Sequence, residues 1–574
     1  MNSTSGQASP ATPLVATSAL AGGWAGAVLL AAAIFAVYLL ATPWTTLWDR
    51  DEPRFAQAAV EMASTGQLLF PTFNGEPRVH KPILITWLMA ASVSLLGPTE
   101  LAARCWSPVG AALAALFTFA IGRRLFSVST GLLAMLVLAT TPLLLIEGAV
   151  ATTDAVLLAC TTGALAAFVR LRDPRAKPRA LDLAGLTLAL AAGMLTKGPV
   201  GLAVPLLVIA ATLALDRRTL AGAAPARQQQ VVLAVVAAAA ASVGLFLLWA
   251  IPANRATGGL FLREGFGFHV LRRFVTPLEG HGGNLLLTLP FYLLVVLTGF
   301  FPWTLHLPEA LRALRQKSAG AGAAGPLLAS WLVLPFALFS IAATKLPHYV
   351  LPIWPALAIA VAATIEATRA RVLGPHEEAS RRWGPWLLAP VAGLAVAGAA
   401  AAAVLAPLPG LRASAAVLAL VFCFTNLAAI RMYRRGRHLP TVLVLAGGML
   451  ATHLLLALWL LPAGEPAKPA PIIAAAIRAA TLPTVPVFTH EFDEPSLVFY
   501  LRRLPVTPLG SDEAAVSWTR ERAPGVLVLP REVLARIEGQ QGPLPVAEIA
   551  SARGLDLVHG RPLELVAVRR QERR

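Results

Sequence analysis

The chain has 574 residues, of which 57% are hydrophobic and 13% are charged, and its mean hydropathy is +0.68. This composition is far more apolar than that of an ordinary soluble fold, so most of the chain is expected to lie in a membrane. The net charge of +17 does not indicate nucleic-acid binding, because an excess of Lys and Arg in a membrane protein is first expected in cytoplasmic loops.

A helix needs about 20 apolar residues to cross a hydrocarbon core of roughly 30 Å. One shorter apolar segment, 83–97, is expected to lie in the membrane interface. The first apolar run is expected to be retained, because no charged segment precedes it as in a signal peptide. Thirteen runs are predicted to span: 20–42, 102–122, 128–145, 153–170, 181–195, 199–215, 230–252, 286–306, 326–343, 348–367, 384–406, 411–430 and 440–462.

The orientation of the chain follows from its basic residues, provided that 83–97 does not cross. The connections after every second span then hold most of the Lys and Arg, while the short opposite turns carry only Lys197, Lys345 and Arg412. The positive-inside rule therefore places the N-terminus in the cytoplasm, and an odd number of spans sends the C-terminus outside.

Three regions are then external: a first loop at 43–101, a second loop at 253–285 and a C-terminal domain at 465–574. Short apolar strands alternate with helical stretches in this last region, which predicts a small α/β domain. The predicted fold is thus a polytopic α-helical membrane domain over 1–464 with interfacial helices, followed by an external α/β domain.

The first external loop opens with the sequence Trp-Asp-Arg-Asp-Glu-Pro-Arg at 48–54, which includes Asp51, Glu52 and Arg54. A solvated loop start is an equally good explanation of these charges taken alone. However, residues 53–64 have the pattern of an amphipathic helix, and the Arg-Val-His-Lys-Pro segment at 78–82 leads into the interfacial segment. These features predict a loop that lies along the membrane surface.

Asp154 stands at the external start of the fourth span, after Thr152 and Thr153. A helix N-cap is the simpler explanation, since Asp and Thr are favoured there. If Asp154 lies near Asp51, however, the two form a pair of carboxylates of the kind that tunes active sites.

Lys197 and Lys345 occupy tight external turns, Thr-Lys-Gly-Pro at 196–199 and Lys-Leu-Pro-His-Tyr at 345–349. A lysine can extend to the interface from any helix end, but both lysines run against the positive-inside bias, and an ammonium group suits a phosphate.

In the second loop, His269 and Arg273 are expected to share one face of a helix. Ionisable groups gathered at one membrane face predict a site for a phosphate-bearing amphiphile.

These motifs resemble those of the GT-C membrane glycosyltransferases, which use a polyprenyl-phosphate sugar as donor. The similar features are the external Asp-Glu at 51–52, the Lys-Pro at 81–82, the Arg-Arg-Leu-Phe at 123–126 and the Thr-Thr-Asp at 152–154. The two lysine turns, the His-x-x-x-Arg-Phe pattern at 269–274 and the C-terminal domain are more specifically similar to the bacterial lipid A aminoarabinose transferases.

The resemblance implies transfer of 4-amino-4-deoxy-L-arabinose from undecaprenyl phosphate to a lipid A phosphate, with inversion, on the periplasmic side of the inner membrane. The partners are then the lipid-linked aminosugar, lipid A and membrane lipids, with no nucleic acid, and the chain is expected to be a monomer. Asp51 and Asp154 are the implied catalytic residues. The implied substrate-binding residues are Glu52, Arg54, Lys81, Lys197, His269, Arg273, Lys345, His348 and Tyr349.

No cofactor is required by this scheme. His80 stands where the related enzymes have an acidic residue before the Lys-Pro, so a metal at that position is not implied. Zinc remains an option if His80 and His269 approach each other.

Two rival functions are open. A protein O-mannosyltransferase-like enzyme of the same fold has a hydroxyl acceptor, for which Asp51 would be a true base. A flippase for lipid-linked sugars would line a path through the membrane with polar groups, and the apparent confinement of polar residues to one face disfavours it.

Overall fold

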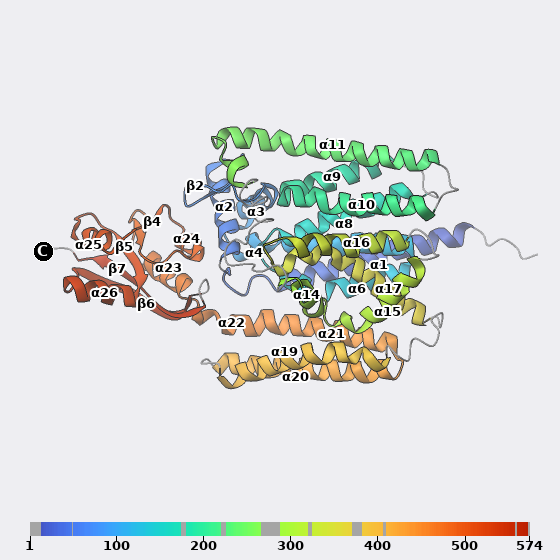
Figure 1. Cartoon of the computed structure of the whole chain (residues 1–574). Helices are drawn as coiled ribbons and strands as arrows, with labels where there is room; N and C mark the ends of the chain where they lie inside the picture. The colour runs from blue at the N-terminus through green and yellow to red at the C-terminus, as the bar shows by residue number, and fades with distance from the viewer. Residues whose placement is uncertain are drawn as a thin grey trace, which may run out of the picture.

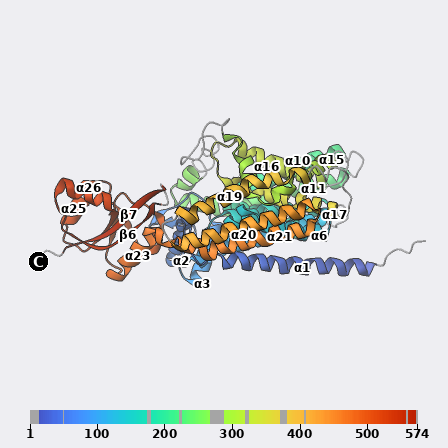
Figure 2. The ribbon, with the colours of Figure 1, turned by 90° about the horizontal axis from the view of Figure 1, so that it is seen from below.

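The computed structural model describes residues 13–48, 50–173, 179–219, 225–265, 288–318, 324–369, 381–405, 409–556 and 560–571. A long bundle of apolar helices carries a smaller α/β domain at one end, as both views show (Figures 1 and 2). Among the described residues, eleven helices are long and apolar enough to cross a membrane, or twelve if one bent pair is a single span. The polytopic class predicted from the sequence is confirmed.

The helices of the bundle follow the predicted order closely. Most begin or end at a charged residue or a proline, as expected where a span meets the interface. They are α1 (Pro13–Leu40), α5 (Trp106–Leu125), α6 (Val128–Ala139), α7 (Pro142–Glu147), α8 (Asp154–Arg172), α9 (Ala180–Lys197), α10 (Pro199–Thr219), α11 (Pro225–Ala256), α14 (Phe291–Gly299), η2 (Trp303–His306), α15 (Leu307–Ser318), α16 (Ala324–Ile341), η3 (Pro347–Ile353), α17 (Trp354–Arg369), α19 (Pro385–Leu405), α20 (Pro409–Arg434) and α21 (His438–Leu455).

Two of the predicted spans are broken in the structure. The run 128–145 forms α6 and then α7, with the break before Pro142, whose missing N–H and ring do not allow the helix to continue. The run 286–306 forms α14, after which the chain turns by 107° into η2 and α15. The prediction of thirteen continuous spans is therefore wrong for these two runs.

Three short helices lie between α1 and α5, namely α2 (Asp51–Thr65), α3 (Leu84–Leu96) and α4 (Glu100–Arg104). The interfacial segment predicted at 83–97 is α3, which has 13 residues. At 1.5 Å per residue it is roughly 20 Å long, which is shorter than a hydrocarbon core. It packs beside α2 at the end of the bundle that faces the α/β domain (Figure 1).

A small hairpin joins α2 to α3 through β1 (Thr72–Phe73) and β2 (Glu76–Pro77). Its turn residues Asn74 and Gly75 both have positive φ angles, 56° and 85°, as a two-residue hairpin turn requires. Glu61 of α2 holds this turn, because its carboxylate accepts from the Asn74 N–H at 2.7 Å and the Thr72 hydroxyl at 2.6 Å.

After α21 the chain continues through η4 (Leu456–Leu460), α22 (Leu461–Ala463) and η5 (Glu465–Ala467) into the C-terminal domain. The five strands lie in the order β4-β3-β5-β7-β6; β3 pairs in parallel with β4 and β5, while β7 is antiparallel to β5 and β6. The α/β character is as predicted. The elements are α23 (Pro469–Ala480), β3 (Val487–Thr489), α24 (Pro495–Leu501), β4 (Val506–Pro508), α25 (Asp512–Arg520), β5 (Val526–Pro530), α26 (Arg531–Gln541), β6 (Val546–Asp556) and β7 (Arg561–Arg570).

The C-terminal domain is attached to the first loop by polar contacts as well as by a shared apolar core. The Tyr500 hydroxyl donates to Glu100 Oε1 at 2.7 Å and accepts from the Leu47 N–H at 2.8 Å. Two hydrogen bonds of 2.8 Å join Asn74 to Val506. The Asn74 side-chain amide donates to the Val506 carbonyl, and the Val506 N–H donates to the Asn74 side-chain oxygen. The domain therefore fixes both the segment before α2 and the hairpin after it.

The two ends of the bundle differ in charge. The site end is the end beside the C-terminal domain, and the basic end is the opposite end, where α1 begins (Figures 1 and 2). Ion pairs such as Arg124 with Asp173, at 2.8 Å, and Arg172 with Asp216, at 3.1 Å, join helix ends at the basic end.

Candidate active site

A buried ion pair joins α2 to α4 at the site end. Glu52 is 3% exposed and Arg104 is 2% exposed. Arg104 donates through Nε and Nη2 to the two carboxylate oxygens of Glu52, each at 2.7 Å. The backbone N–H groups of Trp48 and Ala151 donate to the same carboxylate at 2.7 and 2.6 Å.

These four donors use the hydrogen-bonding capacity of Glu52. Burial by itself raises the pKa of a carboxyl group, but the charge and hydrogen bonds of Arg104 and the two N–H groups together lower the pKa of Glu52 below its ordinary value. Glu52 was predicted to bind substrate; the structure instead gives it an internal role, because its acceptors are already occupied.

Arg104 also holds the chain segment that leads to Asp51. Its guanidinium donates to the carbonyl oxygens of Thr42 at 2.7 Å, Thr45 at 2.8 Å and Thr46 at 3.0 Å. The Glu52–Arg104 pair therefore fixes the end of α1 against the start of α2, and so sets the position of Asp51 in the first turn of α2.

A second buried carboxylate, Asp154, is 6% exposed at the start of α8. Lys197, the last residue of α9, places its Nζ 2.5 Å from Asp154 Oδ1. The N-cap of α8 is Thr153, which makes no capping hydrogen bond through its side chain, so the N-cap explanation of Asp154 is wrong. Asp154 faces into the bundle and pairs with the Lys-Gly-Pro turn.

Two further residues complete what we call the Asp154 cluster, which consists of Glu147, Asp154, Lys197 and His348. His348 Nε2 is 3.9 Å from Asp154 Oδ2, and His348 Nδ1 is 3.6 Å from Glu147 Oε1. Glu147 is 8% exposed and accepts from the Thr152 hydroxyl at 3.1 Å. Glu147 was not anticipated; the only signal for it is a carboxylate at the end of an otherwise apolar run.

The Asp154 cluster has a donor set that suits a divalent metal ion. The ligand atoms of Glu147, Asp154 and His348 lie within 4.8 Å of one another, and they are nitrogen and oxygen donors of the kind that zinc accepts. Lys197, however, already supplies a cation to Asp154 Oδ1. His80 is exposed and belongs to neither of the potential metal-binding groups among the described residues, and its predicted partner His269 lies outside them.

The Lys-Gly-Pro turn after α9 lies against the Lys-Pro of the first loop. Gly198 has a φ of +63°, a value that a side chain would strain, and a Cβ at this position would lie 3.8 Å from Pro82. Lys81 is partly buried there, and its charge acts on both Asp154 and His348. The segments that contain Lys81, Asp154 and Lys197 were predicted to converge, and in the structure they lie close together.

We call the mouth of this cluster the first turn of α2, which carries Asp51, together with the segment after the hairpin, which carries Arg78. Asp51 is exposed, while Arg78 is buried and stacks over the Phe55 ring, 4.6 Å from its centre. Burial lowers the pKa of Arg78 to about 10, with the Asp51 charge raising it and the Arg54 charge lowering it further, so Arg78 stays protonated at neutral pH. The charge of Asp51 also acts on Glu147 and His348.

Lys345 does not join the cluster in the way that was predicted. Its buried ammonium group donates to the carbonyl oxygens of Phe339, at 3.3 Å, Ala342, at 2.7 Å, and Ser340. An ammonium group has three hydrogens, so these bonds use all of its donors. Lys345 therefore closes the C-terminal end of α16 instead of presenting its charge to a ligand.

Tyr349 and His348, from the same turn, do lie at the cluster. Lys197 Nζ is 5.2 Å from the centre of the Tyr349 ring, and the His348 and Tyr349 rings meet edge to face at 5.1 Å. The remaining predicted residues, His269 and Arg273, lie outside the described residues. The second loop nevertheless approaches the first, because Gly265 packs on the Val79 carbonyl and has no room for a side chain.

Comparison with known proteins agrees with this architecture. A family model described as dolichyl-phosphate-mannose-protein mannosyltransferase matches residues 80–251. The undecaprenyl phosphate-alpha-4-amino-4-deoxy-L-arabinose arabinosyl transferase of Edwardsiella ictaluri is 30% identical over 363 residues, which is 62% of each chain. The Aeromonas hydrophila protein of the same name is 32% identical over 335 residues, 57% of each. The matches thus span less than two thirds of these relatives' length.

Solved structures extend the likeness over nearly the whole chain. The crystal structure of ArnT from Cupriavidus metallidurans bound to undecaprenyl phosphate superposes with a TM-score of 0.76 at 23% identity, covering 95% of this chain and 98% of that one. The archaeal oligosaccharyltransferase AglB from Archaeoglobus fulgidus gives 0.52 at 13% identity, covering 88% and 69%. The chain therefore has the GT-C membrane fold, and over the matched part its sequence is similar to the aminoarabinose transferases, as its motifs predicted.

Proposed function

We propose that this chain transfers 4-amino-4-deoxy-L-arabinose from undecaprenyl phosphate to a phosphate of lipid A. The observation that carries the proposal is the convergence of Lys81, Lys197 and Asp154 at the site end, with Asp51 at the mouth. Cations beside carboxylates at a membrane boundary suit a phosphate-linked sugar. The names of the similar proteins, and the ligand in the ArnT structure, support the same donor.

The proposed orientation places the site end in the periplasm. The basic end carries arginines at the ends of α5, α8, α17 and α20, and the positive-inside rule directs such an end to the cytoplasm. The N-terminus is then cytoplasmic, and the C-terminal domain stands in the periplasm of a bacterial cell. A lipid-linked donor and lipid A both present phosphate at this face.

The proposed reaction is one inverting displacement at the anomeric carbon. A phosphate oxygen of lipid A forms the new bond to C1 while the bond from C1 to the polyprenyl phosphate breaks, and that phosphate leaves with the electron pair. Lys81 and Lys197 stabilise its negative charge, and Arg54 and Arg78 act from the mouth. Fixed charges aimed at a developing charge are usually the largest catalytic contribution.

Asp51 does not need to act as a base in this scheme, because a phosphate monoester is largely ionised at neutral pH. We assign Asp51 to the sugar side of the reaction, where its carboxylate stabilises the positive charge that develops at C1. Asp154 holds Lys197 in place through their 2.5 Å contact. The scheme uses no metal or other cofactor, and one copy of the chain supplies every group in it.

The test is the Asp51→Asn variant in the host cell, with lipid A weighed by mass spectrometry. We expect the pentosamine adduct to disappear. Glu76→Gln, which removes an exposed carboxylate from the neighbouring hairpin, is the matched control and should keep the adduct. An unchanged adduct in the Asp51→Asn variant would refute the assignment.

A second candidate function is transfer of a sugar to a protein hydroxyl, because the family model that matches residues 80–251 is described as a protein mannosyltransferase. A Ser or Thr hydroxyl must lose its proton, so Asp51 would then be a true general base. Unchanged lipid A together with lost protein glycosylation in the Asp51→Asn variant would favour this candidate.

A flippase is less well supported, but the argument that polar residues are confined to one membrane face is too simple. Polar side chains are buried away from the site end too, including Asn426 of α20 and His453 of α21. Each has one local contact, since Asn426 donates to the Phe422 carbonyl at 2.8 Å and His453 packs 5.7 Å from the Tyr38 ring, while Asn426 Oδ1 and His453 Nε2 have no hydrogen-bond partner among the described residues. Accumulation of the donor on the cytoplasmic leaflet in the Asp51→Asn variant would favour the flippase.

A further inference from the structure

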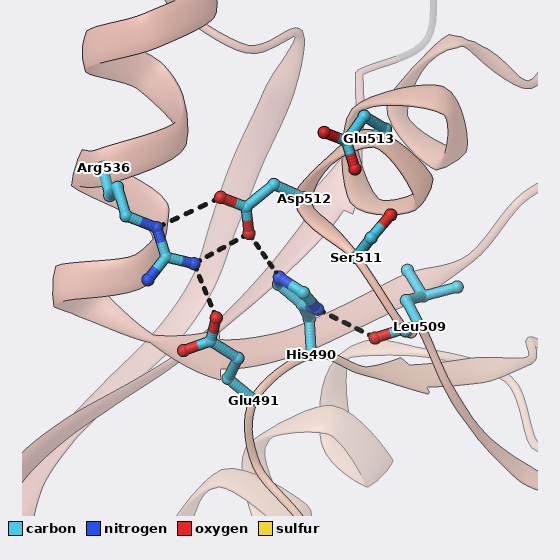
Figure 3. A pocket seen from close by; sticks show the side chains of 8 residues that line it. His490, Glu491, Leu509, Ser511, Asp512, Glu513 and Arg536 are labelled. Atoms are coloured by element: carbon cyan, nitrogen blue, oxygen red, sulfur yellow. Dashed lines mark hydrogen bonds and ion pairs between the residues drawn. The ribbon is translucent and has the colours of Figure 1, made fainter.

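A second group of titratable side chains lies in the C-terminal domain, away from the bundle. It surrounds a pocket of about 520 Å³ between the end of β3, the start of α25 and one face of α26 (Figure 3). We call this the His490 pocket; its lining residues are His490, Glu491, Leu509, Gly510, Ser511, Asp512, Glu513 and Arg536. α25 and α26 lie on the side of the domain that faces away from the bundle (Figure 1), so the pocket is separate from the Asp154 cluster.

His490 is only 3% exposed, and its hydrogen bonds fix which nitrogen carries a proton. Nδ1 lies 2.8 Å from the carbonyl oxygen of Leu509. A carbonyl only accepts, so Nδ1 carries the hydrogen, and Nε2 of the neutral ring has a free electron pair. A backbone carbonyl on one ring nitrogen is the usual support of a histidine whose other nitrogen binds a metal.

The Nε2 electron pair faces another acceptor. Nε2 lies 2.7 Å from Asp512 Oδ1, and two acceptors at that distance repel each other unless a cation lies between them. A proton on Nε2 is one such cation. A metal ion is the other, because its bonds to imidazole nitrogen and carboxylate oxygen use the same electron pairs.

Glu491 supplies a third ligand. The ligand atoms of His490, Glu491 and Asp512 lie within 4.8 Å of one another. Two ligands at about 2.1 Å from a tetrahedral zinc ion are roughly 3.4 Å apart, so only small shifts are needed, and the pocket leaves room for a water as the fourth ligand. Glu491 is half exposed, so its side chain is free to make such a shift.

Arg536 now occupies the place between the two carboxylates. It donates to Asp512 Oδ1 at 2.7 Å and Oδ2 at 3.1 Å, and to Glu491 Oε1 at 2.6 Å (Figure 3). Its side chain is 42% exposed on the surface of α26, so it can turn into solvent without disturbing the domain core. The two carboxylates carry two negative charges, which one divalent ion balances in place of the guanidinium and a proton on His490.

We propose that the His490 pocket binds one divalent transition-metal ion of the zinc class through His490 Nε2, Asp512 and Glu491, in exchange with Arg536. The donor set of one imidazole and two carboxylates suits such an ion. Arg536 is a competitor of the metal, which distinguishes this proposal from a simple ion-pair network, in which Arg536 would be a supporting member.

The experiment uses the full chain in detergent, stripped with a chelator and then titrated with Zn²⁺ by equilibrium dialysis. The His490→Asn variant should bind one ion fewer than the unchanged chain. The His348→Asn variant removes the imidazole from the Asp154 cluster, the other candidate group, and should keep the ion of the His490 pocket. Co²⁺, whose visible absorption reports tetrahedral ligands, should lose this signal in the His490→Asn variant only.

Removal of the competitor gives the sharper result. Arg536→Gln should tighten Zn²⁺ binding by about tenfold, the size expected when two exposed ion pairs no longer compete. Arg531→Gln is the matched control, because Arg531 is on the same helix, is similarly exposed and also pairs with two carboxylates, Glu548 and Glu564. This control should leave the Zn²⁺ affinity unchanged.

Two outcomes would overturn the proposal. One is an equal number of bound ions in the unchanged chain and the His490→Asn variant. The other is an Arg536→Gln variant that melts at lower temperature without binding Zn²⁺ more tightly, which is the behaviour of an ion-pair network alone. If His490→Asn does not fold, Glu491→Gln removes a ligand from a half-exposed position and must weaken binding for the proposal to stand.

Discussion

Two buried carboxylates at the site end, Glu52 and Asp154, each meet a cation, yet their surroundings differ. Glu52 receives four donors at 2.6–2.7 Å, two from Arg104 and two from the backbone. Asp154 has one close cation, Lys197, at 2.5 Å, while His348 stands back at 3.9 Å. The first pair is complete within the protein, whereas the second retains capacity for a ligand.

The residues around the two pairs differ in the same way. The other donors of Arg104 bind carbonyl oxygens just after the end of α1, and these bonds fix the backbone there. Lys197 stands at a turn that packs on Pro82, beside a second lysine, Lys81. A pair that is saturated by backbone groups holds the fold, and a pair that lies beside other charged side chains is suited to binding and chemistry.

The largest effect is expected for Arg104→Ala. This change leaves the Glu52 charge buried without its partner, which typically costs about 3–5 kcal/mol of stability. Thermal unfolding in detergent and the yield of monodisperse protein measure the loss. Arg502→Ala, which removes an exposed arginine with a bond to the Pro98 carbonyl, is the control and should change little. A small effect of Arg104→Ala would show that the pair is not structural.

Asp154→Asn should lower the transfer rate by about a hundredfold, because it loosens a cation aimed at the leaving phosphate. The amide oxygen still accepts from Lys197, so the protein should remain folded in size-exclusion chromatography. The measurement is turnover with purified donor and lipid A. Asp182→Asn removes a similarly buried carboxylate paired with Arg170 at the basic end, and it should leave turnover intact. Equal losses in both variants would contradict the comparison.

Glu147→Gln should have a smaller effect, a loss of roughly tenfold in kcat, which corresponds to about 1.4 kcal/mol of transition-state stabilisation. Glutamine keeps an oxygen for the Thr152 hydroxyl but removes the carboxyl group near His348. Steady-state kinetics separate kcat from KM. A rise in KM alone would place Glu147 in substrate binding instead of in the reaction.

The smallest effect on turnover is expected for Lys345→Met, which tests whether this lysine stabilises the fold and does not contact a ligand. Loss of its bonds to the carbonyl oxygens at the end of α16 should cost about 1–2 kcal/mol of stability. Turnover per folded molecule should not change, whereas Lys197→Met should lose most activity per folded molecule and also some stability, because it leaves the buried Asp154 carboxylate without its close cation. Lost turnover at unchanged stability in Lys345→Met would show that Lys345 contacts the donor after all.

The sequence predicted the membrane class, the amphipathic helix of the first loop, the C-terminal domain and the meeting of Lys81, Asp154 and Lys197. These predictions rest on local hydrophobic pattern and on charges placed against the positive-inside bias, which a sequence displays directly. It did not reveal the partners of these charges. Glu52 meets Arg104 across 52 positions, and the role of Lys345 depends on where α16 ends.

Residues whose meaning depends on packing were missed altogether. Glu147 looks like the end of a span until the break before Pro142 turns it toward His348. The His490 pocket draws residues from the segments after β3 and β4 and from α25 and α26, with no spacing that signals a common site. In each case the tertiary structure, and not local preference, decides which charges meet.

The attachment of the C-terminal domain to the first loop has a mechanical consequence for how lipids enter. The hydrogen bonds of Asn74 with Val506, and of Tyr500 with Leu47 and Glu100, make the loop and the domain one stiff wall of the site. The opposite wall contains the 3₁₀ segment η3, which carries His348 and Tyr349 and contacts α14, the helix that ends at the 107° bend into η2 and α15. We expect this wall to yield when a bulky acceptor arrives, while Asp51 stays in place against the stiff side.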